Sequence, residues 1–254
     1  MDFSPIQVFD DSLALSRAAA ELLANLIHET WSAGQPFSLV LCGGGTPQQI
    51  YRLLGQPPYS LSLPWSSLHV FWGDERCVPP TDPESNFAQA HAAWLRHVPL
   101  PAENIHRIKG ELGGASAAAH YTEELRLFAR DTLAPPDQTW PNFSAVLLGL
   151  GEDGHTASLF PGAPLPAEDT QPVLTVNAHY QDRPAERVTL TPLVFNAAQT
   201  LIGLVTGAAK APALAAALQA ERDPVRWPIH RLRPSAGQLL WLVDRAAASR
   251  LDHA

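Results

Sequence analysis

Cysteine is scarce in this sequence: only Cys42 and Cys77 occur among its 254 residues. Two thiols can build neither a disulfide framework nor a zinc site of four thiolates. Long apolar runs are missing too, because no stretch reaches the roughly 18 residues that a membrane-spanning helix needs. The acidic segment of residues 1–13 lacks the apolar core of a secretory leader. These absences favour a reduced, cytoplasmic compartment and no membrane partner.

Positive charge is sparse, and only two of the 17 basic residues are lysines, Lys109 and Lys210. The net charge of −8 argues against nucleic acid or an anionic membrane as the main partner. An anionic small molecule is compatible with this charge if its site is locally positive. Each basic residue near a glycine-rich loop is therefore a candidate ligand. A monomer is compatible with the sequence, which does not define the oligomeric state.

Apolar strands alternate with helices along the chain. The expected strands cover residues 36–42, 68–72, 143–150, 187–191, 200–206 and 238–244, and the expected helices cover 12–31, 84–96, 116–130 and 207–220. This alternation predicts a three-layer α/β/α sandwich around a mostly parallel, Rossmann-like sheet. No linker divides the chain, so residues 1–254 are expected to form one domain.

Polar, glycine-rich segments follow three of the predicted strands directly, at residues 43–46, 73–76 and 151–155. In open α/β sheets, ligands bind outside the carboxyl ends of the strands. The three segments are therefore expected to converge on one site at one edge of the sheet.

The first segment joins a strand to a helix through Gly43, Gly44, Gly45 and Thr46. Glycines let backbone N–H groups approach an anion, and a helix N-terminus adds unpaired donors and a positive dipole end. Thr46 is expected to cap the helix, with Pro47 at its first position, or to donate its hydroxyl to a phosphate. No Gly-Lys-Ser/Thr follows, so this is not a Walker A loop. A phosphate cradle and a plain strand-to-helix turn both fit.

The second segment carries Asp74, Glu75 and Arg76. An arginine offers a planar, permanently charged fork that suits a phosphate or a developing oxyanion. Asp74 can orient Arg76 or bind sugar hydroxyls. The alternative is a surface turn with a local ion pair, which stabilises a protein little.

The third segment contains a GxGxxG pattern at residues 149–154, but its context does not fit a dinucleotide site. Pro161 shortens the following segment to less than two helical turns, and no ribose-binding acid follows on a second strand. His155 is more informative, because imidazole exchanges protons near neutral pH and Asp153 can hold its tautomer. A structural histidine is the alternative. An Asp-x-His metal site lacks a clear third ligand, so no metal is expected.

Covalent catalysis has little support in the sequence. There is no GxSxG elbow, Ser158 lies in the middle of its segment, and neither cysteine has an adjacent histidine. Attack by an activated water fits better.

Two later basic residues are candidate ligands. Arg187 opens the strand at 187–191, and Lys210 lies at the start of the helix at 207–220. A lysine in the first turn of a helix opposes the helix dipole, and a bound phosphate would offset that cost. A solvated lysine is the alternative. Residues 230–233 are interpreted as an exposed loop without a role.

The chain resembles the 6-phosphogluconolactonases, within the wider glucosamine-6-phosphate isomerase/deaminase group. The resemblance rests on LVLCGGGTPQQIYRLL (39–54), VFWGDERCVPPTDPESNFAQA (70–90), VLLGLGEDGHTASLFPG (146–162), ERVTLTPLVFNAA (186–198) and GLVTGAAKAPAL (203–214). It implies a Rossmann-like sandwich and hydrolysis of 6-phospho-D-glucono-1,5-lactone in the pentose phosphate pathway, with no cofactor. It also implies that His155 is the general base and that the phosphate or sugar is held by Gly44, Gly45, Thr46, Arg76 and Lys210.

Two other functions stay open at this point. One is an isomerase or deaminase on the same fold, although the GDER and GEDGHTASLFPG stretches favour a lactonase. The other is a sugar-phosphate sensor without turnover, against which the pairing of His155 with Asp153 argues. The residues alone reach only a phosphorylated small polar ligand and acid–base chemistry.

Overall fold

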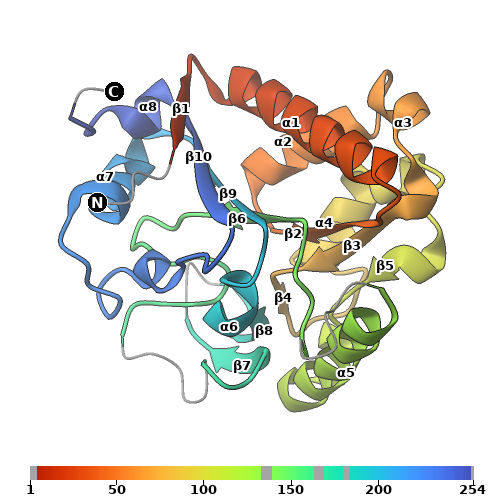
Figure 1. The fold of residues 1–254 in the computed structure, drawn as a ribbon. Helices are drawn as coiled ribbons and strands as arrows, with labels where there is room; N and C mark the ends of the chain where they lie inside the picture. The colour runs from red at the N-terminus through yellow and green to blue at the C-terminus, as the bar shows by residue number, and fades with distance from the viewer. Residues whose placement is uncertain (1–4, 133–138, 163–168, 180–182, 253–254) are drawn as a thin grey trace.

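A computed structural model describes residues 5–132, 139–162, 169–179 and 183–252 of the chain (Figure 1). It contains a seven-stranded sheet in the order β1-β10-β9-β6-β2-β3-β5 and a three-stranded sheet in the order β4-β8-β7. Every pair of neighbours in the large sheet is parallel, and both pairs in the small sheet are antiparallel.

The strands of the large sheet are β1 (Ile6–Phe9), β2 (Phe37–Leu41), β3 (Leu68–Trp72), β5 (Ile105–His106), β6 (Ala145–Gly149), β9 (Thr200–Val205) and β10 (Gln238–Asp244). Those of the small sheet are β4 (Asp74–Arg76), β7 (Val173–Asn177) and β8 (Glu186–Leu190). The helices are α1 (Ser12–Ser32), α2 (Gly45–Leu54), α3 (Tyr59–Ser62), α4 (Asn86–Ala93), α5 (Gly114–Thr132), α6 (Pro192–Phe195), α7 (Ala211–Gln219) and α8 (Arg245–Ala248).

The core lies between the large sheet and its helices. Every residue of β2 and β9 is buried, as expected for strands covered on both faces. Helix α1 buries a row of apolar residues, Leu15, Ala19, Leu23 and Ile27, because residues four apart share a helix face. Burying each of the larger side chains contributes about 1.5–3 kcal/mol. Helix α1 packs on α2 and β10, whereas α5 packs against the small sheet (Figure 1).

The predicted sandwich with a parallel sheet is confirmed, with one correction. The strand expected at 187–191 belongs to β8, which pairs antiparallel with β4 and β7 outside the parallel sheet. Strands β1, β4, β5 and β7 escaped prediction. Strands β1 and β7 are partly exposed and carry no continuous apolar run, and β4 and β5 are only 3 and 2 residues long. The helix expected at 207–220 begins as a 3₁₀ turn over Ala208–Lys210 before α7.

Within the described ranges, no helix combines the length and the apolar character that crossing a lipid bilayer requires.

Candidate active site

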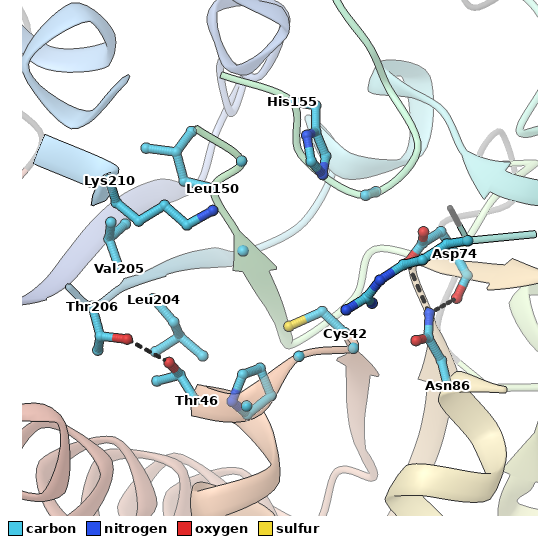
Figure 2. A pocket seen from close by; sticks show the side chains of 18 of the residues that line it. Cys42, Thr46, Asp74, Asn86, Leu150, His155, Leu204, Val205, Thr206 and Lys210 are labelled. Carbon is cyan, nitrogen blue, oxygen red and sulfur yellow. Dashed lines mark hydrogen bonds between the residues drawn. The ribbon is translucent and has the colours of Figure 1, made fainter. Parts of the chain in front are cut away.

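A cavity of about 260 Å³ lies at the carboxyl ends of the central strands, where the three polar segments converge. Nine of the predicted residues line it: Gly43, Gly44, Gly45, Thr46, Asp74, Arg76, His155, Arg187 and Lys210. Figure 2 shows two sides to the cavity, with Lys210 and Thr46 on one side and His155 and Asp74 on the other. The convergence predicted from the sequence is therefore present in the structure.

The glycine-rich segment enters α2 differently from the prediction. The helix begins at Gly45, and its N-cap is Gly44, whose φ of +115° is unfavourable for residues with a side chain. Thr46 therefore lies inside the first turn, and the prediction that it caps the helix is wrong. Its hydroxyl lies 2.7 Å from the hydroxyl of Thr206, the residue that follows β9. The unpaired amides of the first turn of α2 are at the cavity wall, as a phosphate cradle requires.

Lys210 reaches the same side of the cavity from the segment that connects β9 to α7. It ends the 3₁₀ turn before α7, and Figure 2 shows its amine extending into the cavity. Asp244, at the end of β10, accepts hydrogen bonds from the Gly207 amide with both oxygens at 3.0 Å, and from the Ala247 amide at 2.7 Å. This carboxylate fixes the start of the turn that carries Lys210.

Two arginines of the small sheet face the cavity side by side. Arg76 and Arg187 are direct partners in the antiparallel register of β4 and β8, and they are only 6% and 3% exposed. Burial lowers the pKa of Arg187, the charge of Asp74 opposes this effect and the charge of Arg76 adds to it. Within the described part of the chain, Arg76 Nε and Arg187 Nη2 are buried without a hydrogen-bond partner. Such unsatisfied donors are costly, and an anion in the cavity would satisfy them.

The carboxylate of Asp74 is held by two neutral donors. Asn86 of α4 donates to Oδ1 at 3.1 Å, and the Ser158 hydroxyl donates to Oδ2 at 2.7 Å. The guanidinium of Arg76 instead donates to the backbone carbonyl of Glu84 and lies 3.8 Å from its carboxylate. Of the two roles open for Asp74, orienting Arg76 is not the one that the structure shows, because Glu84 holds this guanidinium.

Glu75 is almost fully buried beneath the site and anchors α4. Its carboxylate accepts from the amides of Arg76, Asn86 and Phe87 at 2.7–2.8 Å and from the Ser85 hydroxyl at 2.9 Å. Burial raises the pKa of Glu75, and these hydrogen bonds oppose that rise. The segment at residues 74–76 is thus a buried strand and not a surface turn.

His155 and Asp153 form the pair expected from their spacing. His155 Nδ1 lies 2.6 Å from Asp153 Oδ1, and the carboxylate also accepts from the His155 amide at 3.1 Å. Burial favours the neutral carboxyl, but the hydrogen bond and charge of His155 hold the pKa of Asp153 below its ordinary value. A Cβ on Gly151 would lie 2.0 Å from His155 Nδ1, so only glycine leaves room for the ring. Phe160 stacks on the imidazole with ring centroids 4.8 Å apart.

Other interpretations of this segment find no structural support. Residues 150–162 contain no helix, so the GxGxxG pattern does not open a dinucleotide-binding unit. In the described ranges, no cluster of three or more His, Cys, Asp or Glu side chains is arranged to hold a metal ion. Burial raises the pKa of both thiols, Cys42 in the cavity wall and Cys77 nearby, the latter to about 12. Neither is poised as a thiolate nucleophile.

Sequence reasoning missed several residues around the cavity. Asn86, Arg183 and Thr206 line it. Thr206 follows an apolar strand directly, which is the signal that identified the other segments; Asn86 and Arg183 carry no such signal. The interpretation of residues 230–233 as an exposed loop is wrong at Arg231, which is 6% exposed and donates to Pro224, Phe160 and Gly162 carbonyls. It ties down the loop that follows His155.

Similarity to known proteins agrees with this site. A family model described as glucosamine-6-phosphate isomerases/6-phosphogluconolactonase matches residues 10–241. The chain belongs to this family. A 6-phosphogluconolactonase of Nostoc sp. is 37% identical over 248 residues, covering 97% of this chain and 98% of the relative. One of Mycobacterium tuberculosis is 38% identical over 256 residues, covering 98% of each.

A solved structure supports the relationship at the level of the fold. The 6-phosphogluconolactonase from Trypanosoma cruzi superposes with a TM-score of 0.85 at 30% identity, covering 99% of this chain and 98% of that one. The family groups isomerases with lactonases, so the chemistry has to be argued from the cavity.

Proposed function

We propose that this chain hydrolyses 6-phospho-D-glucono-1,5-lactone to 6-phosphogluconate, in the oxidative branch of the pentose phosphate pathway, by general-base activation of water. Its relatives carry the name of this activity. The observation that carries the mechanism is the 2.6 Å contact of Asp153 with His155 Nδ1, in a cavity that also presents a helix N-terminus and two buried arginines.

The two sides of the cavity suit the two ends of the substrate. The amides of Gly44, Gly45 and Thr46, with the amine of Lys210, form a positive site for the phosphate. The lactone carbonyl then lies toward His155, on the other side of the cavity in Figure 2, and toward Arg76 and Arg187 of the cavity lining. Binding energy from the phosphate fixes the ring for attack at C1.

Proton transfer follows from the His155–Asp153 pair. Asp153 occupies Nδ1, so Nε2 takes a proton from water as the water oxygen attacks C1. The carbonyl oxygen of the lactone becomes an oxyanion, which Arg76 stabilises with the support of the neighbouring Arg187. When the tetrahedral intermediate collapses, the bond from C1 to the ring oxygen breaks, and His155 returns the proton to that oxygen.

The test is hydrolysis of the lactone formed in situ from glucose 6-phosphate by its dehydrogenase, with a second dehydrogenase reporting 6-phosphogluconate. We expect acceleration over the spontaneous rate that survives EDTA. His155→Ala should lower kcat by about 10²-fold to 10⁴-fold, the usual contribution of a general base. The matched control is His97→Ala, which removes an exposed histidine outside the cavity. A His155→Ala variant within about threefold of wild type would contradict the assignment of the base, because it would then supply almost none of this contribution.

A further inference from the structure

Buried tyrosine hydroxyls hold the backbone where two neighbouring strands enter the site. Tyr51 of α2 donates to the Cys42 carbonyl at 2.8 Å and accepts from the Cys42 amide at 3.1 Å. Tyr121 of α5 makes the same pair of bonds with Trp72, both at 3.0 Å. The two tyrosines are only 1% and 0% exposed.

Each hydroxyl bonds backbone groups just beyond the point where the register of a strand pair ends. Strand β5 is short, and its pairing with β3 ends at Phe71, one residue before Trp72. The pairing of β6 with β2 ends at Val40, two residues before Cys42. Buried backbone N–H and C=O groups need partners, and a phenol can donate and accept at once. One side-chain atom therefore bonds both backbone groups of a residue that lies beyond the paired register.

The two clamped residues immediately precede the two segments that meet the ligand. Cys42, on the floor of the cavity in Figure 2, is followed by the cradle at residues 43–46. Trp72 is followed by Gly73 and then by β4, which carries Asp74 and Arg76. We propose that Tyr51 and Tyr121 are positioning residues, the first for the phosphate cradle and the second for the oxyanion-stabilising strand. This inference rests on the proposed function.

The rings are held independently of their hydroxyls. Tyr51 stacks on Trp94 with ring centroids 5.9 Å apart, and Tyr121 lies in the hydrophobic core. Replacement by phenylalanine therefore keeps the packing and removes the clamp alone. Burial also raises the pKa of both phenols, so they stay protonated and able to donate over the working pH range.

The experiment compares Tyr51→Phe, Tyr121→Phe and the control Tyr59→Phe, a partly buried tyrosine outside the cavity. Misplacing a binding or catalytic group by about 1 Å can cost up to about 10²-fold. For Tyr51→Phe we expect KM to rise about tenfold with kcat within about twofold, because the cradle binds ground and transition states alike. For Tyr121→Phe we expect kcat to fall about tenfold with KM within about twofold, because Arg76 acts on the oxyanion.

Calorimetric binding of 6-phosphogluconate provides a readout that does not need turnover. Tyr51→Phe should weaken its binding about tenfold, as a misplaced cradle predicts, and Tyr121→Phe should not. Incorporation of 4-aminophenylalanine at either position restores a donor and should recover part of the loss.

Several results would overturn the inference. It is wrong if both phenylalanine variants melt at lower temperature but keep wild-type kcat, KM and product affinity, since the hydroxyls would then be structural only. The division of roles is wrong if both variants change the same parameter. Wild-type protein that binds 6-phosphogluconate but does not hydrolyse the lactone defeats the proposed function, and the binding comparison still decides the role of Tyr51.

Discussion

Arg76 and Arg187 lie directly opposite each other on β4 and β8, so two buried guanidinium groups share one face of the small sheet. Like charges in this position destabilise a sheet, and unsatisfied buried donors add to the cost. The arrangement places two positively charged side chains at the cavity wall at a cost in stability, and such costs are typical of functional sites.

Replacing one of these arginines should therefore lower activity without lowering the stability of the fold. For Arg187→Met we expect a melting temperature equal to or above that of wild type, because a buried charge is replaced by an apolar side chain of similar length. We expect kcat/KM to fall by about 10²-fold, comparable with loss of one oxyanion donor. Thermal melts and the coupled assay measure both. A large loss of stability with intact kinetics would show that Arg187 serves the fold instead.

Lys210 offers a second test, with an internal control. Lys210→Ala should mainly raise KM, because in the proposed mechanism the amine binds the phosphate in the ground and transition states alike. Lys109, the other lysine of the chain, lies outside the cavity, so Lys109→Ala should leave both constants unchanged. A fall in kcat at constant KM would reassign Lys210 to the chemical step.

Gly151 limits the position of the His155 imidazole, the proposed general base. A methyl group there would lie 2.0 Å from His155 Nδ1 and 2.5 Å from Asp153 Oδ1, so Gly151→Ala must displace the pair. We expect kcat to fall by about 10²-fold, as for a catalytic group moved by about 1 Å. Gly55→Ala is the control, since its nearest neighbour would be 3.4 Å away at an ordinary φ of −77°. Unchanged kcat in Gly151→Ala would argue that His155 is not the base.

Acid stability should depend on two histidines, His69 and His106, that are not part of the cavity lining. His69 Nδ1 lies 3.1 Å from His106 Nε2, and His106 Nδ1 lies 2.7 Å from Glu124. Burial, followed by the charge of His106, lowers the pKa of His69 from 6.5 to about 4. Between these values the unfolded chain binds more protons than the folded one, so stability falls as pH drops from 6.5 toward about 4.

Melting temperatures of His69→Gln measure this contribution. The variant cannot titrate, so the fall in melting temperature across that pH window should be shallower than in wild type. The Glu124 pKa is also lowered, chiefly by its hydrogen bond to His106, so some loss in acid should persist below this window. His97 is exposed, so the control variant His97→Gln should show the same change of melting temperature with pH as wild type. If the melting temperature falls equally with pH in wild type and both variants, His69 is not the cause of the loss of stability in acid.

The parallel α/β sandwich and most of the cavity follow from local sequence patterns. Fully buried strands carry continuous apolar runs, and residues at their carboxyl ends must meet at one edge. Residues 43–46, Arg76 and His155 were therefore predictable as neighbours, and the short spacing of Asp153 from His155 predicted their contact.

The pairing of the strands and the contacts of the buried polar groups depend on how the folded chain brings distant segments together. Arg187 lies beside Arg76 because β8 pairs antiparallel with β4. The two residues are 111 positions apart in the sequence, so no local pattern indicates this pairing. The same holds for Asp74, which is bound by Asn86 and Ser158, and for Tyr121, which clamps Trp72. Local sequence carries hydrophobic periodicity, but hydrogen bonds between distant segments form only once packing has brought them together.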